Sequence, residues 1–173
     1  DETAPTPDRG LRVFISSDIE GTAGITEWEE TDHRKNSPWY THFCRQMTRE
    51  AAAACEGAMA AGATDILVKD AHDTGRNIDP GGLPVGVQLN RGWSGGPFWM
   101  VSGLADHFDA VAFTGYHSPA YGSGNPLAHT MIEEIDELKI NGERASEFTI
   151  HSYIAGMQGV PVVFVSGDYE LCQ

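Results

Sequence analysis

Two carboxylates, Asp18 and Glu20, follow directly after an apolar stretch of the sequence. They stand in VFISSDIEGTAG (residues 13–24), two positions apart, so an extended chain would point both side chains the same way. Two histidines follow similar apolar stretches, His72 in KDAH and His117 in GYH. Carboxylates and imidazoles together are typical ligands of Zn²⁺, with Mn²⁺ or Co²⁺ as alternatives. These residue types therefore indicate a metal site.

The case for a metal rests on these residues jointly. Brought together without a cation, such groups would repel or desolvate one another. More than four protein ligands would indicate two ions, and a carboxylate such as Asp18 can bridge them and fix a water that becomes hydroxide near neutral pH. A single acid at a strand end is more often a helix cap or turn residue, and we expect this role for Asp168. Asp70 is expected to support His72 or to orient its turn.

Strands of a parallel sheet must position these residues, because ligand sites in open α/β sheets lie outside the carboxyl ends of the strands. Apolar runs predict buried strands at residues 11–17, 64–70, 109–115 and 160–167. Helices are predicted at residues 38–62, 97–107 and 146–158. This alternation predicts a three-layer α/β/α fold with a mostly parallel sheet.

Two connecting segments carry their own signals. IDELKINGERA predicts a hairpin that turns at Asn141 and Gly142. Residues 73–96 are rich in glycine and proline, which predicts a long loop with at most one short strand near VGVQL. Loops of that length usually serve a site or an interface. The acidic run EWEETD at residues 27–32 is expected to be a solvated loop.

Length and charge bound the class of protein. A chain of 173 residues fits one compact domain, which we place at residues 11–173 after a flexible tail at residues 1–10. The net charge of −14 argues against nucleic acid and anionic membranes as partners. No apolar run has the length of a membrane-spanning helix. The last residues read as a strand followed by the first turn of a helix, so we expect the gene product to continue.

The cysteines do not predict a disulfide framework. Cys44 and Cys55 fall on one predicted helix, too far apart to pair, and Cys172 stands near the end. Reduced thiols favour the cytoplasm, whereas a first residue that is Asp1 and not Met leaves export to the periplasm open.

The segment DIEGT at residues 18–22 resembles the DxDGT signature of haloacid dehalogenase-type phosphatases, in which the first Asp is a nucleophile beside Mg²⁺. The second acid here is Glu, and such a site has no use for His72 or His117. A metal-dependent phosphatase of this type is the alternative enzyme.

Five motifs occur in a characteristic order and spacing: SSDIEGTAGI, VKDAHDTGRN, FTGYHSPA, AHTMI and INGERASEFTIHSYIAGMQGVPVVFVSGD. Together they resemble the D-aminopeptidase DppA family, the zinc peptidases of family M55, from Leu11 to Asp168. The resemblance implies a Rossmann-like N-terminal domain with two zinc ions, a C-terminal region absent from this sequence, and a ring-like homo-oligomer, a decamer in the family. It also implies an aminopeptidase that uses a zinc-activated hydroxide to release N-terminal D-amino acids from short peptides or amides.

The resemblance also assigns metal ligands. Asp18 would bridge the two zinc ions. Glu20 and His117 would ligate one ion. His72 and Glu147 would ligate the other. From its position alone, Glu147 would be read as a favourable charge at the start of a helix.

The resemblance implies a catalytic role for His129, in AHTMI. His151 lies four residues after Glu147, where we expect a surface or supporting imidazole and not a further ligand. The loop at residues 73–96 and its Trp93 depart from the family pattern and could line a pocket or simply pack. A non-catalytic assembly protein that keeps zinc for structure is the alternative outside the enzymes.

Overall fold

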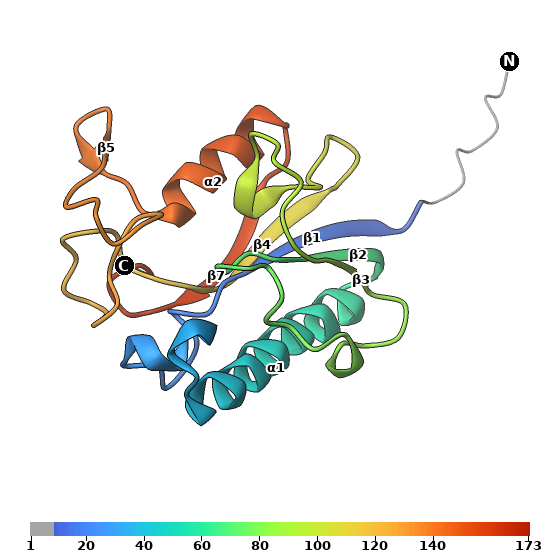
Figure 1. The fold of residues 1–173 in the computed structure, drawn as a ribbon. Coiled ribbons are helices and arrows are strands. Elements are labelled where there is room, and N and C mark those ends of the chain that lie inside the picture. Colours follow the sequence, from blue (N-terminus) through green and yellow to red (C-terminus); the bar gives the residue numbers. More distant parts are fainter. Residues whose placement is uncertain (1–8) are drawn as a thin grey trace, which may run out of the picture.

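Five parallel strands form the centre of the molecule (Figure 1). The computed structural model describes residues 9–173, so most of the predicted N-terminal tail lies outside the described residues. In spatial order the strands are β3 (Gln88–Asn90), β2 (Ala63–Asp70), β1 (Leu11–Ser17), β4 (Ala110–Tyr116) and β7 (Val162–Gly167). All neighbouring pairs are parallel. The carboxyl ends of the three middle strands therefore meet at one edge.

Helix α1 (Pro38–Ala60) is the longest element and follows the predicted bounds closely. The Ser37 hydroxyl accepts a hydrogen bond from the Trp39 amide, and Pro38 at the first helical position needs no partner for a missing N–H. Gly62, with φ of 97°, ends the helix in a conformation that favours glycine.

Helix α2 (Glu147–Met157) confirms the helix predicted at residues 146–158. Ser146 and Thr149 form a reciprocal capping box at its start, and Gly159 follows its end with φ of 72°. The cap fixes Glu147 as the first residue of the helix.

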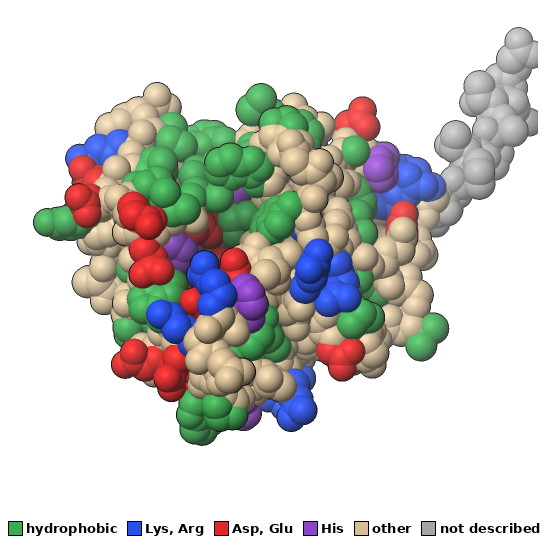
Figure 2. Space-filling model, in the orientation of Figure 1, with side chains coloured by type: hydrophobic (Ala, Val, Ile, Leu, Met, Phe, Trp, Pro, Cys, Tyr) green, Lys and Arg blue, Asp and Glu red, His purple; other side chains and the backbone are tan. Residues whose placement is uncertain are grey.

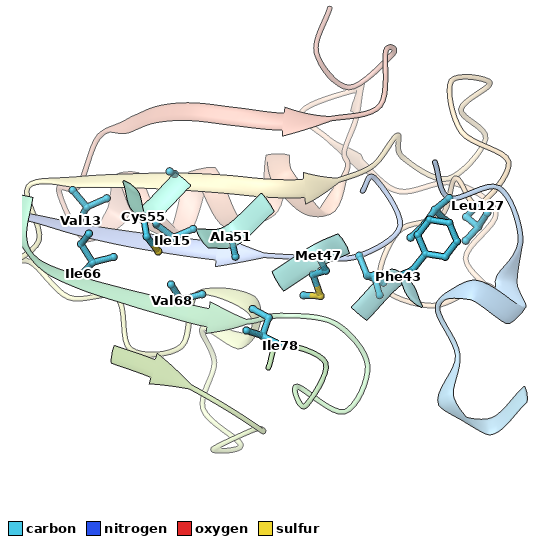
Figure 3. Packing of buried hydrophobic residues seen from close by; sticks show 13 residues of the cluster. Val13, Ile15, Phe43, Met47, Ala51, Cys55, Ile66, Val68, Ile78 and Leu127 are labelled. Atoms are coloured by element: carbon cyan, nitrogen blue, oxygen red, sulfur yellow. The ribbon is translucent and has the colours of Figure 1, made fainter. Parts of the chain in front are cut away.

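The two helices cover opposite faces of the sheet (Figure 1). Alternate residues of β1 separate accordingly: Val13 and Ile15 pack on the α1 side, and Phe14 packs with Ala155 of α2. The α1 side of the core is drawn in Figure 3, where α1 contributes Phe43, Met47, Ala51 and Cys55. The three-layer α/β/α prediction is confirmed.

The prediction of a helix at residues 97–107 is wrong. Only the short 3-10 helix η4 (Trp99–Val101) forms there. Ser102 leaves the helix with extended dihedrals, and Gly103 adopts φ of 103°, which a continuing helix does not allow. Met100, Val101 and Leu104 are buried beside α2 all the same, in an irregular segment (Figure 1).

The predicted hairpin is confirmed by the antiparallel pair β5 (Lys139–Ile140) and β6 (Glu143–Arg144). Its turn residues, Asn141 and Gly142, both have positive φ, as a type I′ turn requires. In the loop at residues 73–96, the short strand expected near VGVQL forms slightly later, as β3. The loop also contains the 3-10 helix η3 (Pro80–Gly82).

The structure describes all three cysteines as free thiols, as predicted. Among residues 9–173, no helix has both the length and the apolar character needed to cross a bilayer.

Two glycines let the chain after β1 pass close to the end of β4. The Gly21 amide donates to the Gly115 carbonyl over 2.8 Å. A Cβ on Gly21 would lie 1.7 Å from the Tyr116 carbonyl oxygen, and one on Gly115 would lie 2.3 Å from the Asp18 carbonyl oxygen. This crossing sets Glu20, the neighbour of Gly21, against the end of β4.

Replacing Gly21 with Ala is expected to lower the free energy of unfolding by at least about 2 kcal/mol, because backbone must move to admit the methyl group. Gly57→Ala is the matched control. Gly57 lies within α1 with no atom near its Cβ position, so Ala should stabilise the helix by up to about 1 kcal/mol. Urea unfolding measures both changes, and equal effects of the two substitutions would contradict the assigned close approach.

Candidate metal centre

Four of the predicted site residues meet at the carboxyl edge of the sheet. Asp18 and Glu20 follow β1, His72 follows β2, and His117 follows β4. All four are buried. The residues that the sequence placed by strand register are therefore brought together.

Two further residues reach the same place from outside the sheet. Glu147 enters from the first turn of α2, and His129 enters from the irregular segment between β4 and β5. Oxygen Oε1 of Glu147 lies 3.4 Å from Nε2 of His129 and accepts a hydrogen bond of 2.7 Å from the Met131 amide. Strand periodicity could not have located either residue.

The side chains form two overlapping groups around Asp18. His72 Nδ1 lies 3.4 Å from Asp18 Oδ1 and 3.1 Å from Glu20 Oε1. His117 Nε2 lies 3.6 Å from Asp18 Oδ2 and 3.4 Å from Glu147 Oε2. Asp18 thus presents one oxygen to each imidazole, which is the arrangement that a bridging carboxylate needs.

Ligand atoms also converge as triplets within 4.8 Å of one another. Asp18, Glu20 and His117 form one such triplet, and His117, His129 and Glu147 form another. A third, formed by Asp32, His33 and Asp73, lies at the surface, where exposed acids commonly occur without an ion.

Each imidazole is held by a backbone carbonyl on its far side. His72 Nε2 is 2.8 Å from the Thr31 oxygen, His117 Nδ1 is 2.9 Å from the Ser118 oxygen, and His129 Nδ1 is 2.9 Å from the Leu127 oxygen. A carbonyl can only accept, so the proton stays on that nitrogen. When the ring is neutral, the other nitrogen turns its lone pair toward the carboxylates, as in metal-binding histidines.

Several buried polar atoms of the cluster have no hydrogen-bond partner. They are Asp18 Oδ2, Glu20 Oε2 and His117 Nε2. An unpartnered buried polar atom costs about 1–3 kcal/mol, and more when it is charged. One or two divalent cations would satisfy all of these atoms, so the donor set fits a metal of the kind that accepts oxygen and imidazole ligands.

Without a cation, His72 and His117 hold their second protons more tightly than a free imidazole does, because the pKa of each is raised. Burial disfavours a charged His117, but Glu147 and Asp18 outweigh it and raise the pKa of His117 to about 10. Burial likewise opposes charge on His72, and Glu20 and Asp18 raise its pKa well above the usual value. Burial, together with the charge of Glu20, raises the pKa of Asp18.

The supporting residues behave mostly as expected. Asp70 accepts hydrogen bonds from the amides of Asn77 and Ile78, and the Asn77 side chain donates to the His72 carbonyl. Asp70 therefore orients the turn after His72. Asp168 accepts from the Leu171 amide, but a turn and not the expected helix follows it, and it also accepts from the hydroxyl of Ser118, the neighbour of His117.

The run EWEETD is not simply a solvated loop. Thr31 is buried and supplies the carbonyl that orients His72, and the Trp28 ring packs edge-on against His129 at 5.2 Å. The acidic residues of the run predicted exposure, and Trp28 was the single residue in it whose type indicated packing. His151 is buried and not at the surface, and its Nδ1 is 2.6 Å from the Glu147 carbonyl oxygen.

A family model of D-aminopeptidases, that of peptidase family M55, matches residues 11–173. The chain belongs to peptidase family M55. A D-aminopeptidase from Bacillus subtilis (strain 168) is 33% identical over 158 residues, which is 91% of this chain and 56% of that protein. The chain therefore spans about half the length of this M55 relative.

The fold comparison agrees. The solved structure of the Zn-dependent D-aminopeptidase DppA from Bacillus subtilis, described as a self-compartmentalizing protease, superposes with a TM-score of 0.82 at 30% identity. The match covers 91% of this chain and 56% of that one. The M55 resemblance and the fold class predicted from the motifs are confirmed, and the phosphatase alternative is not favoured.

Metal binding should release protons, because the metal-free His117 is protonated below about pH 10 and must become neutral to ligate. The apparent zinc affinity is then expected to rise about tenfold per pH unit for each proton displaced, across pH 6 to 8. Calorimetric titrations in buffers of different ionisation enthalpy count the protons released. An affinity that does not change with pH would contradict this description of the M55 centre.

Proposed function

We propose that this chain carries the catalytic metal centre of a zinc-dependent aminopeptidase that releases N-terminal D-amino acids from short peptides or amides. The observation that supports this most directly is the set of unpartnered buried atoms on Asp18, Glu20 and His117. M55 membership and the similarity to D-aminopeptidase of Bacillus subtilis in sequence and in structure point in the same direction.

The proposed ligands would hold two zinc ions. Asp18 would bridge them, since its two oxygens face different imidazoles. Glu20 and His117 would complete one site. His72 and Glu147 would complete the other. Such a pair would polarise the scissile carbonyl and lower the pKa of a water molecule.

His129 is an imidazole of the cluster that lines the cavity and is not among the proposed zinc ligands. Its side chain is 12% exposed and lines the cavity above the cluster, whereas His117 is fully buried. His117 stacks on one face of the ring at a centroid distance of 4.3 Å, and Trp28 packs at its edge. With Nδ1 held by the Leu127 carbonyl, Nε2 is free to take a proton and pass it to the leaving amine.

The charge around the cavity suits a substrate with a free amino terminus. Carboxylates of Asp32, Asp73, Glu133 and Glu134 line it together with the ligands. Acidic, basic and histidine side chains gather around a hollow in the face of the molecule shown in Figure 2. A positively charged amine is attracted to such a rim, while nucleic acid and anionic membranes are repelled.

We also propose assembly into a ring-like homo-oligomer, a decamer as in the M55 resemblance. The description of the DppA structure as self-compartmentalizing supports this. Light scattering coupled to size-exclusion chromatography measures the mass in solution.

The first test is metal content together with amide hydrolysis. Elemental mass spectrometry is expected to find about two zinc ions per chain, and the protein should hydrolyse D-Ala p-nitroanilide faster than the L isomer, with loss of activity on chelation. Two zinc ions without hydrolysis of either isomer would favour the non-catalytic zinc-binding alternative. Magnesium-dependent phosphatase activity without zinc would overturn the proposal.

His129→Ala is expected to lower kcat by about 10² or more while zinc content stays unchanged, because His129 moves a proton and is not among the proposed ligands. His107→Ala is the matched control, since His107 is exposed and precedes β4 at the opposite edge of the sheet. If His129→Ala lost zinc, the His117, His129 and Glu147 triplet would be a ligand set and the catalytic role would be wrong.

A further inference from the structure

The cavity above the metal centre has a large aromatic component in its wall. Its volume is about 670 Å³, and Trp28, Trp93 and Trp99 all line it, although the whole sequence contains only four tryptophans. Met131 and Ile132 add aliphatic surface. A space of this size admits more than the methyl side chain of alanine.

Trp93 is fixed in the wall by several contacts. The buried Lys69 places its ammonium 4.3 Å from the centroid of the Trp93 ring and donates to the Gly92 carbonyl. The indole N–H donates to the Asp73 carbonyl over 2.6 Å. The Gly92 amide donates to the Gly75 carbonyl over 2.8 Å, which ties the segment to the turn after β2. The ring is therefore a rigid surface.

The indole rings of Trp93 and Trp99 are only partly covered by other side chains. Trp93 is 44% exposed and Trp99 is 52% exposed, although both line a cavity. Trp99 also adopts φ of 37°, a conformation that bulky residues rarely adopt outside functional sites. When an apolar group of a ligand covers such a surface and removes it from water, the burial stabilises the bound ligand.

We propose that Trp93 and Trp99 form an apolar subsite that selects substrates with an aromatic or large aliphatic group next to the scissile amide. This inference rests on the proposed aminopeptidase function, and it names the substrate class. The same cavity brings Arg34 and Lys35 to its wall, which suits the free carboxylate of a short peptide. An N-terminal alanine would leave the two indoles in water.

The simpler explanation of Trp93 is that it only supports the turn that carries His72, through its bond to Asp73. The two explanations predict different kinetics. Loss of turn support should weaken zinc binding and slow every substrate alike. Loss of an apolar contact should raise KM for bulky substrates and leave alanine substrates nearly unchanged.

The experiment compares kcat/KM of the zinc-loaded protein for amides of D-Ala, D-Leu and D-Phe, and for D-Ala dipeptides whose second residue is Ala or Phe. The first set tests an apolar group before the scissile bond and the second tests one after it. The wild type is expected to prefer the bulky member of one set at least tenfold. Trp93→Ala should reduce that preference about tenfold, mainly through KM, with zinc content unchanged.

Two variants serve as controls. Trp39→Ala removes a tryptophan of similar exposure that does not line the cavity, and it should leave the preference unchanged. Trp93→Phe keeps an apolar ring but lacks the N–H that reaches Asp73. It should retain most of the preference; if it behaves like Trp93→Ala or loses zinc, the turn-support explanation is correct and the subsite is overturned.

A binding measurement separates this inference from the proposed function. The hydroxamates of D-Ala and D-Phe bind zinc whether or not the protein turns over an amide, and calorimetry gives their affinities. Tighter binding of the D-Phe compound by about tenfold, lost in Trp93→Ala, would support the subsite even if no amide were hydrolysed. Equal affinities in the wild type would overturn the subsite while leaving the aminopeptidase proposal intact.

Discussion

Burial of three carboxylates at one sheet edge is the constraint on which the rest of this structure depends. Asp18, Glu20 and Glu147 are each less than 5% exposed, and like charges this close disfavour the folded chain. In the metal-free protein the raised pKa values of His72 and His117 compensate, because the imidazoles remain protonated. Divalent cations would replace those protons, so folding, protonation and metal binding are coupled through one cluster.

The elements around the cluster serve to hold donor atoms in fixed directions. Four of the residues that carry these atoms directly follow parallel strands and so lie at the carboxyl edge of the sheet. The close approach of Gly21 and Gly115 then brings the segment after β1 onto the end of β4. Backbone carbonyls set the tautomer of each imidazole, and the helix cap at Ser146 sets the direction of Glu147. Small changes in backbone position are therefore expected to alter the cluster more than changes in side-chain volume elsewhere.

Most of the fold was predictable from the sequence, because the local signals for strands and helix ends coincide with the elements that the sheet and its two covering helices require. Apolar runs gave the strands, and Pro38, Gly62 and Gly159 marked helix boundaries that the structure keeps. Residues that follow the strands were likewise predictable as a group, although β1 ends at Ser17 and Glu20 is positioned by a turn and not by strand register. Glu147 and His129 came only from the M55 resemblance. Neither lies at a strand end, and their approach to the cluster depends on tertiary packing that no local pattern encodes.

The wrong helix at residues 97–107 shows the limit of apolar patterning near a site. Met100, Val101 and Leu104 are buried, as the apolar pattern predicted, but the backbone that carries them is not helical. An unbroken right-handed helix needs a negative φ at every residue, whereas Trp99 and Gly103 adopt φ of 37° and 103°. The backbone of this segment is therefore irregular although its apolar side chains are buried. The segment packs Val101 and Leu104 into the core and exposes part of Trp99 to the cavity.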